Sequence, residues 1–334
     1  MSKNYENVVS IVIPCFNEEQ VLDETIKRLE EVSSRLSNEY NLETELIFVN
    51  DGSRDRTLSI LLEHSKMNNS IRVINFARNF GHQIAETAGM DAANGAAVVL
   101  IDADLQDPPL LILDMVRKWK EEEFDVICAT RLEREGEKFF KKFTAKAFCR
   151  VFNFLSEIPL PPDTGDFRLM TRRVVDTVRS MPERERYIRG IVSWVGFKQT
   201  SLPYKRAKRF AGETKYPLKK MLSFALTGIL SFSIKPLKAA TLLGVVFSSF
   251  ALIGFFYAIF HKLLTSSWIS GWGSFMLLAL FLSGVQLICI GILGEYLGRV
   301  FLASRERPLY VVESYYGYNQ TKPNLSRSPV VSIK

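Results

Sequence analysis

The sequence contains few of the residues that build disulfide frameworks or histidine metal sites. Four cysteines are present, and their scattered positions disfavour both a disulfide scaffold and a structural zinc site. The three histidines lie too far apart in the sequence to show ligand spacing or a nucleophile–base motif: His64, His82 and His261. We therefore expect a reduced chain whose acid–base chemistry depends on carboxylates.

Two common phosphate cradles are also missing. No predicted strand is followed by G-x-G-x-x-G or by G-x-x-x-x-G-K-[ST], which disfavours a dinucleotide-binding domain and a P-loop. Proline and glycine are sparse, at 13 and 19 residues, while 47% of the chain is hydrophobic, which excludes collagen-like and disordered chains. Residues 1–10 lack the pattern of a secretory signal, so we expect the first domain to remain in the cytoplasm.

Acidic residues are outnumbered, but the surplus of positive charge does not identify a partner. The 43 Lys and Arg residues exceed the 36 Asp and Glu residues, which gives a formal net charge of +7. This surplus suits nucleic acid, anionic lipid or a phosphorylated substrate. Nucleic acid is the least favoured, because the basic residues cluster beside apolar segments and no recognition helix or RNP-like pattern is apparent.

The N-terminal part of the chain carries the pattern of an α/β domain. The 334 residues suffice for about two domains, and residues 8–130 alternate short apolar runs with amphipathic stretches. This alternation is typical of βαβ units in a parallel sheet, whose strands are buried on both faces. The pattern predicts strands over residues 8–14, 45–49, 71–76, 97–101 and 125–129, and helices near 18–37, 54–67, 82–93 and 109–122.

Two long apolar segments follow Pro236. Each has about 22–25 residues, enough to cross a hydrocarbon core of ~30 Å, and a buried hairpin in a soluble protein is the alternative. Trp268 and Trp272 lie in the loop between the segments, where interfacial anchors are expected. By the positive-inside rule, the basic residues at the outer ends place both termini in the cytoplasm. These basic residues are Lys235, Lys238, Arg299, Arg305 and Arg307.

Two further segments have the composition of helices that lie on a membrane surface. Residues 138–156 interleave five basic residues with six phenylalanines, a mixture that suits the headgroup boundary. Residues 218–233 form the second segment. An ordinary amphipathic helix packed on the sheet would explain either one.

An acidic turn follows the fourth predicted strand. Asp102 and Asp104 are separated by one residue, and two such carboxylates can hold a hard divalent cation, with Gln106 adding a carbonyl ligand. Ligands bind at the carboxyl ends of strands in open parallel sheets, which is where these acids emerge. Asp residues in loops also cap helices, and Asp107 before Pro108 has that pattern.

Polar residues follow two other strands of the predicted sheet. Asn17 and Glu18 come after the first strand, and Asp51 comes after the second. Asp51 can accept a hydrogen bond from a nucleobase or ribose, or it can form an Asx turn with Gly52. Because polar groups converge from three strand ends, we interpret this edge of the sheet as a nucleotide pocket.

The motifs taken together resemble a known family. PCFNEE, VNDGS, RNFGHQIAETAGM, DADLQDPP, TGDFRLM and KRFAGETKYPL occur in this order and precede the two apolar segments. They resemble the family 2 glycosyltransferases of the polyprenyl-phosphate group, which includes dolichyl-phosphate mannose synthases and bactoprenol glucosyltransferases. The resemblance covers residues 8–305, and the membrane arrangement is most similar to the bactoprenol branch. It implies an α/β GT-A fold and transfer of a sugar, with inversion, from a nucleotide-sugar to a lipid phosphate.

The resemblance also implies roles for individual residues. Metal and diphosphate binding falls on Asp102, Asp104 and Gln106, and a phosphate contact falls on Arg131. An acid near the acceptor corresponds to Asp166. The implied nucleotide-sugar-binding residues are Pro14, Asn17, Glu18, Asp51 and Asp102, joined by Arg206, Arg209 and Lys215 in a basic loop that the family folds over the diphosphate.

The chemistry of the acceptor leaves the role of Asp166 open. A phosphate monoester is mostly dianionic at neutral pH, so a strong general base is not required. Asp166 is therefore either a base or orienting group, or a structural residue held by Arg168 or Arg172. The two anions that meet in such a site repel each other, and the basic residues between 204 and 220, Arg209 among them, would offset that repulsion.

These observations predict a membrane-bound enzyme with four segments. They are a cytoplasmic GT-A domain at residues 1–217, an amphipathic helix at 218–233, a two-helix hairpin at 234–303 and a cytoplasmic tail at 304–334. Processive synthases carry a QxxRW motif that is absent here, which disfavours polymer synthesis. Gly294 and Gly298 have spacing that permits close helix contact, within one chain or in a homo-oligomer.

The predicted reaction moves glucose from UDP-glucose to undecaprenyl or another polyprenyl phosphate at the bacterial inner membrane, with Mg²⁺ or Mn²⁺. GDP-mannose, UDP-N-acetylglucosamine and a modified arabinose remain alternative donors. A non-catalytic, membrane-tethered nucleotide-binding module is the alternative of a different class, and it predicts that nucleotide binding does not depend on a metal.

Overall fold

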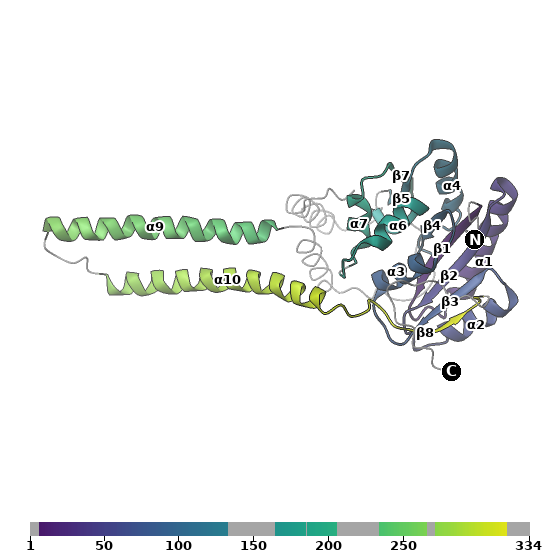
Figure 1. Ribbon diagram of the computed structural model, residues 1–334, viewed down its shortest axis with the longest axis horizontal. Helices are drawn as coiled ribbons and strands as arrows, with labels where there is room; N and C mark the ends of the chain where they lie inside the picture. The colour runs from purple at the N-terminus through teal and green to yellow at the C-terminus, as the bar shows by residue number, and fades with distance from the viewer. Residues whose placement is uncertain (1–6, 133–163, 185, 206–233, 266–270, 319–334) are drawn as a thin grey trace. The chain divides into compact units, whose positions relative to one another are not determined.

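The computed structural model describes residues 7–132, 164–184, 186–205, 234–265 and 271–318 (Figure 1). Contacts divide the chain into two units, one built around a sheet and one containing the two long C-terminal helices. In chain order the elements are β1 Val8–Cys15, α1 Leu22–Tyr40, β2 Glu43–Asn50, α2 Thr57–Met67, β3 Ile71–Phe76, α3 His82–Ala92, β4 Ala97–Leu100, α4 Leu111–Glu122, β5 Val126–Arg131, β6 Thr164–Thr171, α6 Arg172–Ser180, α7 Ile188–Trp194, β7 Gln199–Tyr204, α9 Lys235–Thr265, α10 Trp272–Ser304 and β8 Val312–Tyr316.

The sheet has eight strands in the order β7-β5-β6-β4-β1-β2-β3-β8. β1 lies at its centre and pairs in parallel with β2 and β4, and β2 pairs in parallel with β3. β6 is inserted antiparallel between β4 and β5, and β5 pairs in parallel with β7. The mostly parallel α/β sheet of GT-A type that the resemblance implies is confirmed, as are the five predicted strands.

Side chains that alternate along β1 cover both faces of the sheet. Ile11 and Ile13 point into a core that they share with apolar residues of α1 and α4. Val12 points to the opposite face, where α3 packs so closely that a Cβ on Gly89 would lie 2.1 Å from Val12 Cγ1. The covering helices contact one another in two groups: α1 contacts α2 and α4, and α6 contacts α3 and α7.

The C-terminal segment after the long helices returns to the sheet. β8 pairs antiparallel with β3, and Tyr310 just before it is fully buried. Its hydroxyl donates a hydrogen bond to Asp91 Oδ2 (2.9 Å), and its ring stacks on Phe76 with centroids 5.3 Å apart. The sequence predicts only a tail over residues 304–334, so this edge strand was missed.

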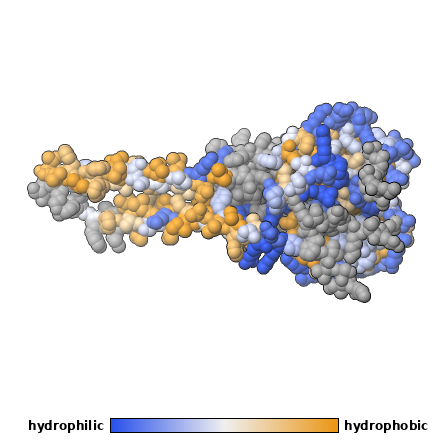
Figure 2. All heavy atoms as spheres, in the orientation of Figure 1, coloured by the Kyte–Doolittle hydropathy of each residue, from blue (hydrophilic) through white to orange (hydrophobic). Residues whose placement is uncertain are grey.

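The second unit consists of the two long apolar helices α9 and α10. Within them, Leu237–His261 and Leu278–Ser304 are long and apolar enough to cross a membrane. None of the most apolar stretch of either helix is buried inside the structure. Hydrophobic residues predominate on both helices on the face shown in Figure 2. A core hairpin would bury this surface, so the exposure favours membrane anchoring.

Several predicted features lie outside the described residues. They are the two surface-helix segments 138–156 and 218–233, the anchor Trp268, and the basic-loop residues Arg206, Arg209 and Lys215.

Candidate functional site

The carboxyl ends of β1, β2 and β4 lie next to one another, as the parallel pairing requires. The turns that follow these strands carry Asn17, Asp51 and Asp102. Burial raises the pKa of the Cys15 thiol at the end of β1, and the nearby carboxylates of Glu18, Asp55 and Asp102 raise it further. Acidic groups from three strand ends therefore converge at one edge of the sheet.

The turns after β1 and β2 are bonded to each other. Asn17 has a φ of 56°, and its backbone N–H donates to Ser53 Oγ (3.0 Å). Its side-chain Oδ1 accepts from the Arg54 N–H (2.8 Å), and the Glu18 N–H donates to Thr57 Oγ1 (2.9 Å). The polar part of the PCFNEE motif thus fixes the shape of both turns. Pro14 is buried within β1, opposite Val49.

Asp51 is an anchor for the loop that precedes α3. Its Oδ1 accepts from the Phe80 N–H (2.6 Å), and its Oδ2 accepts from the Gly81 N–H and Asn79 Nδ2 (2.9 Å each). Burial raises the pKa of Asp51 against the opposing effect of these two N–H groups. Asn50 Oδ1, not Asp51, accepts the Ser53 N–H (3.3 Å) at the turn.

Gly52 allows this loop to approach the turn after β2. Its φ is +65°, and a Cβ at this position would lie 2.5 Å from the backbone C of Arg78 and N of Asn79. The conformation and the space both require glycine, so the VNDGS motif has a clear packing role.

The acidic turn after β4 holds its own shape. Asp104 Oδ1 accepts from the Gln106 N–H (3.1 Å), and Leu105 between them has a φ of 55°. Asp102, Asp104 and Gln106 are all half-buried at the edge of the sheet, although the Oδ1 oxygen of Asp102 is itself buried. Carboxylate and amide oxygens are the ligands that Mg²⁺ takes.

Asp107 is not the helix cap that the sequence predicts. α4 begins at Leu111 and has no side-chain cap bond. The Asp107 carboxylate is 1% exposed and accepts a hydrogen bond from the Tyr204 hydroxyl, which in turn accepts from Arg131 Nε (3.2 Å). Burial, with Asp107 adding to it, raises the pKa of Tyr204 to about 12. This network holds Arg131, whose guanidinium also lies 3.9 Å from Asp107.

A second cluster surrounds His82, the first residue of α3. Its Nε2 lies 3.3 Å from Asp102 Oδ1, 3.4 Å from Glu86 Oε1 and 3.8 Å from Asp166 Oδ2. Although burial opposes the charged ring, the carboxylates of Glu86 and Asp102 outweigh it and hold the pKa of His82 well above its usual value. The acidic turn, α3 and β6 therefore meet at this imidazole.

Glu86 and Asp166 have contrasting surroundings in this cluster. Burial raises the pKa of Glu86 to about 7, and the neighbouring Asp166 carboxylate adds to the effect. Glu86 Oε2 is buried without a hydrogen-bond partner among the described residues. Asp166 is 22% exposed and accepts from Arg189 Nη2 (3.2 Å), while Arg168 Nη2 lies 3.7 Å away.

The structure corrects the expected partners of Asp166. Arg168 is buried and lies beside it as expected, donating also to the backbone oxygens of Gly165 and Asp166. Arg172 does not hold Asp166, because its guanidinium donates to Gly95 O at 2.6 and 2.9 Å. Arg189 takes that place.

Sequence reasoning missed three residues of this cluster, His82, Glu86 and Arg189. The spacing of His82 and Glu86, four residues apart at the start of a predicted helix, was the available signal, because such residues share a helix face. His82, Glu86 and Asp166 each offer a ligand atom within 4.8 Å of the others. With the acidic turn they form a set of donors that fits a divalent cation.

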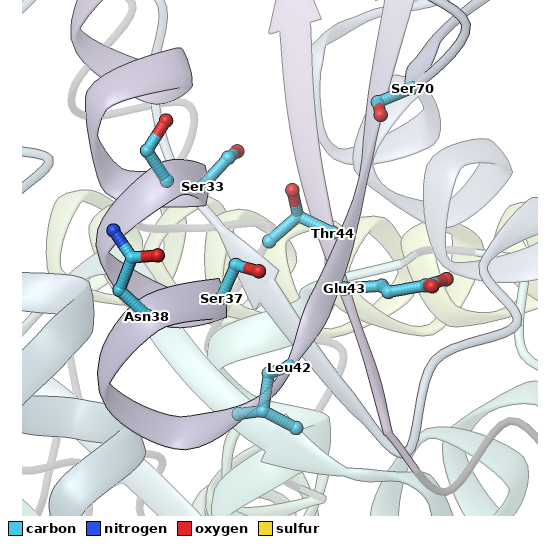
Figure 3. A pocket seen from close by; sticks show the side chains of 8 residues that line it. Ser33, Ser37, Asn38, Leu42, Glu43, Thr44 and Ser70 are labelled. Carbon is cyan, nitrogen blue, oxygen red and sulfur yellow. The ribbon is translucent and has the colours of Figure 1, made fainter.

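A separate hollow of about 740 Å³ lies at the opposite end of the sheet (Figure 3). It is lined by the C-terminal half of α1, the start of β2 and Ser70 before β3. Ligands of open parallel sheets bind at the carboxyl ends of the strands, so this hollow is not part of the site.

The fold and its acidic edge define a GT-A glycosyltransferase. The profile of Glycosyl transferase family 2 matches residues 10–179, and the chain belongs to this family.

Several relatives span nearly the whole chain. The uncharacterized glycosyltransferase YkcC of Bacillus subtilis (strain 168) is 51% identical over 308 residues, 92% of this chain and 94% of that protein. The prophage bactoprenol glucosyl transferase homolog of Escherichia coli (strain K12) is 38% identical over 91% of this chain and 98% of that protein. The bactoprenol glucosyl transferase of Shigella phage SfV is 37% identical over 92% and 98%.

Among solved structures, glucosyl-3-phosphoglycerate synthase from Mycobacterium tuberculosis superposes with a TM-score of 0.45 at 18% identity. The superposition covers 67% of this chain and 78% of that chain.

Proposed function

We propose that the protein transfers glucose from UDP-glucose to undecaprenyl phosphate at the cytoplasmic face of a bacterial inner membrane. The observation that carries the proposal is the meeting of Asp102 from the nucleotide edge with Asp166 from β6 around one histidine. Relatives of 37–38% identity named bactoprenol glucosyl transferase support both the sugar and the lipid.

Asp102, Asp104 and Gln106 would hold Mg²⁺ or Mn²⁺, which when bound offsets the negative charge that develops on the departing diphosphate. Arg131 lies on the same side of the sheet, at the end of β5, and would contact a phosphate group. Its hydrogen bond to Tyr204 and its proximity to Asp107 fix its direction before a ligand arrives. Pro14, Asn17, Glu18 and Asp51 would form or support the nucleotide pocket.

Asp166 is better suited to orienting arginines than to removing a proton. It lies within 3.2 Å of Arg189 and 3.7 Å of Arg168, and a lipid phosphate that is already dianionic needs little help from a base. The anionic acceptor would instead need cations beside it. Asp166→Asn should therefore raise the KM for the lipid phosphate more than it lowers kcat. A loss confined to kcat that disappears as the pH rises would support a general base instead.

The proposed orientation in the membrane follows from the path of the chain. β7 and β8 belong to the same sheet, so the chain between them crosses any bilayer an even number of times. α9 begins at Lys235, with Lys238 in its first turn, and Arg305 and Arg307 follow α10. By the positive-inside rule these outer ends, and hence the sheet, would face the cytoplasm.

The test uses the full chain in lipid nanodiscs containing undecaprenyl phosphate. Radiolabelled UDP-glucose, GDP-mannose and UDP-N-acetylglucosamine are supplied in turn, with and without EDTA. We expect glycolipid from UDP-glucose alone, and its loss with EDTA.

Asp102→Asn should lower the rate by about 10²-fold or more, because it weakens stabilisation of the leaving group. The matched control is Asp114→Asn, on the surface of α4, where Asp114 pairs only with the exposed Arg117 in the described contacts. Glycolipid formed from another donor would replace glucose by that donor's sugar in the proposed reaction. EDTA-insensitive nucleotide binding without transfer from any donor would favour the non-catalytic module.

A further inference from the structure

A single ring nitrogen connects three parts of the fold at the candidate site. His82 Nε2 lies within 3.8 Å of carboxylate oxygens on Asp102, Glu86 and Asp166, and its shortest contact is to Asp102 at 3.3 Å. Asp102 follows β4, Asp166 lies on β6, and Glu86 is one turn further along α3. The acidic turn therefore contacts α3 at this imidazole.

The backbone that carries His82 is held on both sides. Asp51 binds the N–H groups of Phe80 and Gly81 immediately before it. Behind it, α3 packs on β1 with no room for a Cβ at Gly89. The ring is thereby carried on a fixed segment, while Glu86 contacts it from within the same helix at 3.4 Å.

We infer that His82 is a positioning residue for Asp102, and that Glu86 orients His82 in turn. The inference rests on the proposed function, in which Asp102 is a metal ligand. His82 Nε2 lies 3.3 Å from Oδ1 of Asp102, so the second oxygen of that carboxylate can still bind a cation. Such outer partners orient metal-binding carboxylates, and their loss typically costs 10–100-fold in metal affinity or activity.

Direct coordination by His82 is the competing arrangement. The ring nitrogen, Glu86 and Asp166 are close enough together to hold an ion themselves. However, Mg²⁺ takes oxygen ligands, and the acidic turn supplies them without the imidazole. A hydrogen-bonding side chain other than histidine should therefore replace His82 in part, which a metal ligand of the imidazole type would not allow.

The test measures Mn²⁺ affinity and not activity. The full chain in detergent micelles is titrated with Mn²⁺ at saturating UDP, and free Mn²⁺ is followed by electron paramagnetic resonance. His82→Ala should weaken Mn²⁺ binding by about 10–100-fold. His82→Gln, whose side-chain amide can also donate a hydrogen bond, should recover much of that loss, and Glu86→Gln should fall between wild type and His82→Ala.

The control is His64→Ala. His64 Nε2 contacts the exposed Asp23 at 2.9 Å on α1, so its loss should leave Mn²⁺ binding unchanged. Thermal unfolding of each variant separates loss of positioning from loss of fold, and His82→Gln remains informative where His82→Ala unfolds.

Wild-type affinity in His82→Ala, or a His82→Gln variant no better than His82→Ala, would overturn the inference while leaving the proposed function standing. A wild-type chain that binds no Mn²⁺ with UDP would overturn both.

Discussion

Replacing Tyr310 tests whether the returning C-terminal segment is part of the folded sheet. Tyr310→Phe removes one hydroxyl and keeps the ring stacked on Phe76. The buried Asp91, which is 7% exposed, thereby loses a hydrogen bond of 2.9 Å. Bonds to charged groups contribute about 1.5–3 kcal/mol, and we expect the lower end because Arg179 still pairs with Asp91 at 3.4 Å. Tyr310→Ala also removes the buried ring and should cost about 3–5 kcal/mol.

The assay is thermal unfolding of the full chain in micelles, followed by circular dichroism. For a folded unit of this size, about 1 kcal/mol shifts the midpoint by about 2–4 °C, so Tyr310→Phe should lower it by several degrees and Tyr310→Ala by roughly 6–20 °C. Tyr316→Phe is the matched control, because Tyr316 is 36% exposed at the end of β8. Its change should stay within about 0.5 kcal/mol. Equal midpoints for Tyr310→Ala and wild type would refute the claim that the returning C-terminal segment is part of the folded sheet.

Two further predictions concern alkaline stability and the turn after β2. The pKa of Tyr204 is raised in the folded chain to about 12, above about 10 when unfolded. The neutral hydroxyl of Tyr204 stabilises the fold fully below pH 10, and this stabilisation is lost as the pH rises to about 12. In Tyr204→Phe the free energy of unfolding should therefore fall less steeply between pH 10 and 12 than in the wild type. Curves of unfolding free energy against pH that run parallel for the two proteins would contradict this. Gly52→Ala should weaken UDP binding measured by calorimetry, because its Cβ meets backbone 2.5 Å away; wild-type affinity would show that the loop is not needed.

The central strands could be predicted because each is a continuous apolar run. β1 to β5 lie within a few residues of the predicted ranges, since burial on both faces produces a signal that needs no partner. Helix α1 begins later than expected, at Leu22 instead of near residue 18. The residues before Leu22 belong to the turn after β1, where Asn17 and Glu18 form hydrogen bonds with the segment after β2.

The strands that were missed depend on distant pairing. β6 contains Asp166 and Arg168, polar residues that break the apolar run, and it becomes a strand because β4 and β5 lie on either side. β8 pairs with β3 more than 200 residues earlier in the chain, a separation that local sequence patterns do not encode. The acidic turn was visible from its position after a strand, whereas the role of Arg189 depends on where α7 packs.

The contacts of one loop link the candidate site to the chain segment that follows the two long helices. Residues 77–81 run from β3 to His82, and Asp51 binds their C-terminal part. At their other end, the Ala77 N–H donates to Val311 O (3.1 Å), in the segment that follows the hairpin. Phe76 packs between Phe80 of the loop and Tyr310 of the returning chain. This loop leads directly to His82. The contacts that hold its first part come from Tyr310 and Val311, which follow both long helices in the chain, so the loop is fully held only when this C-terminal segment has returned to the sheet.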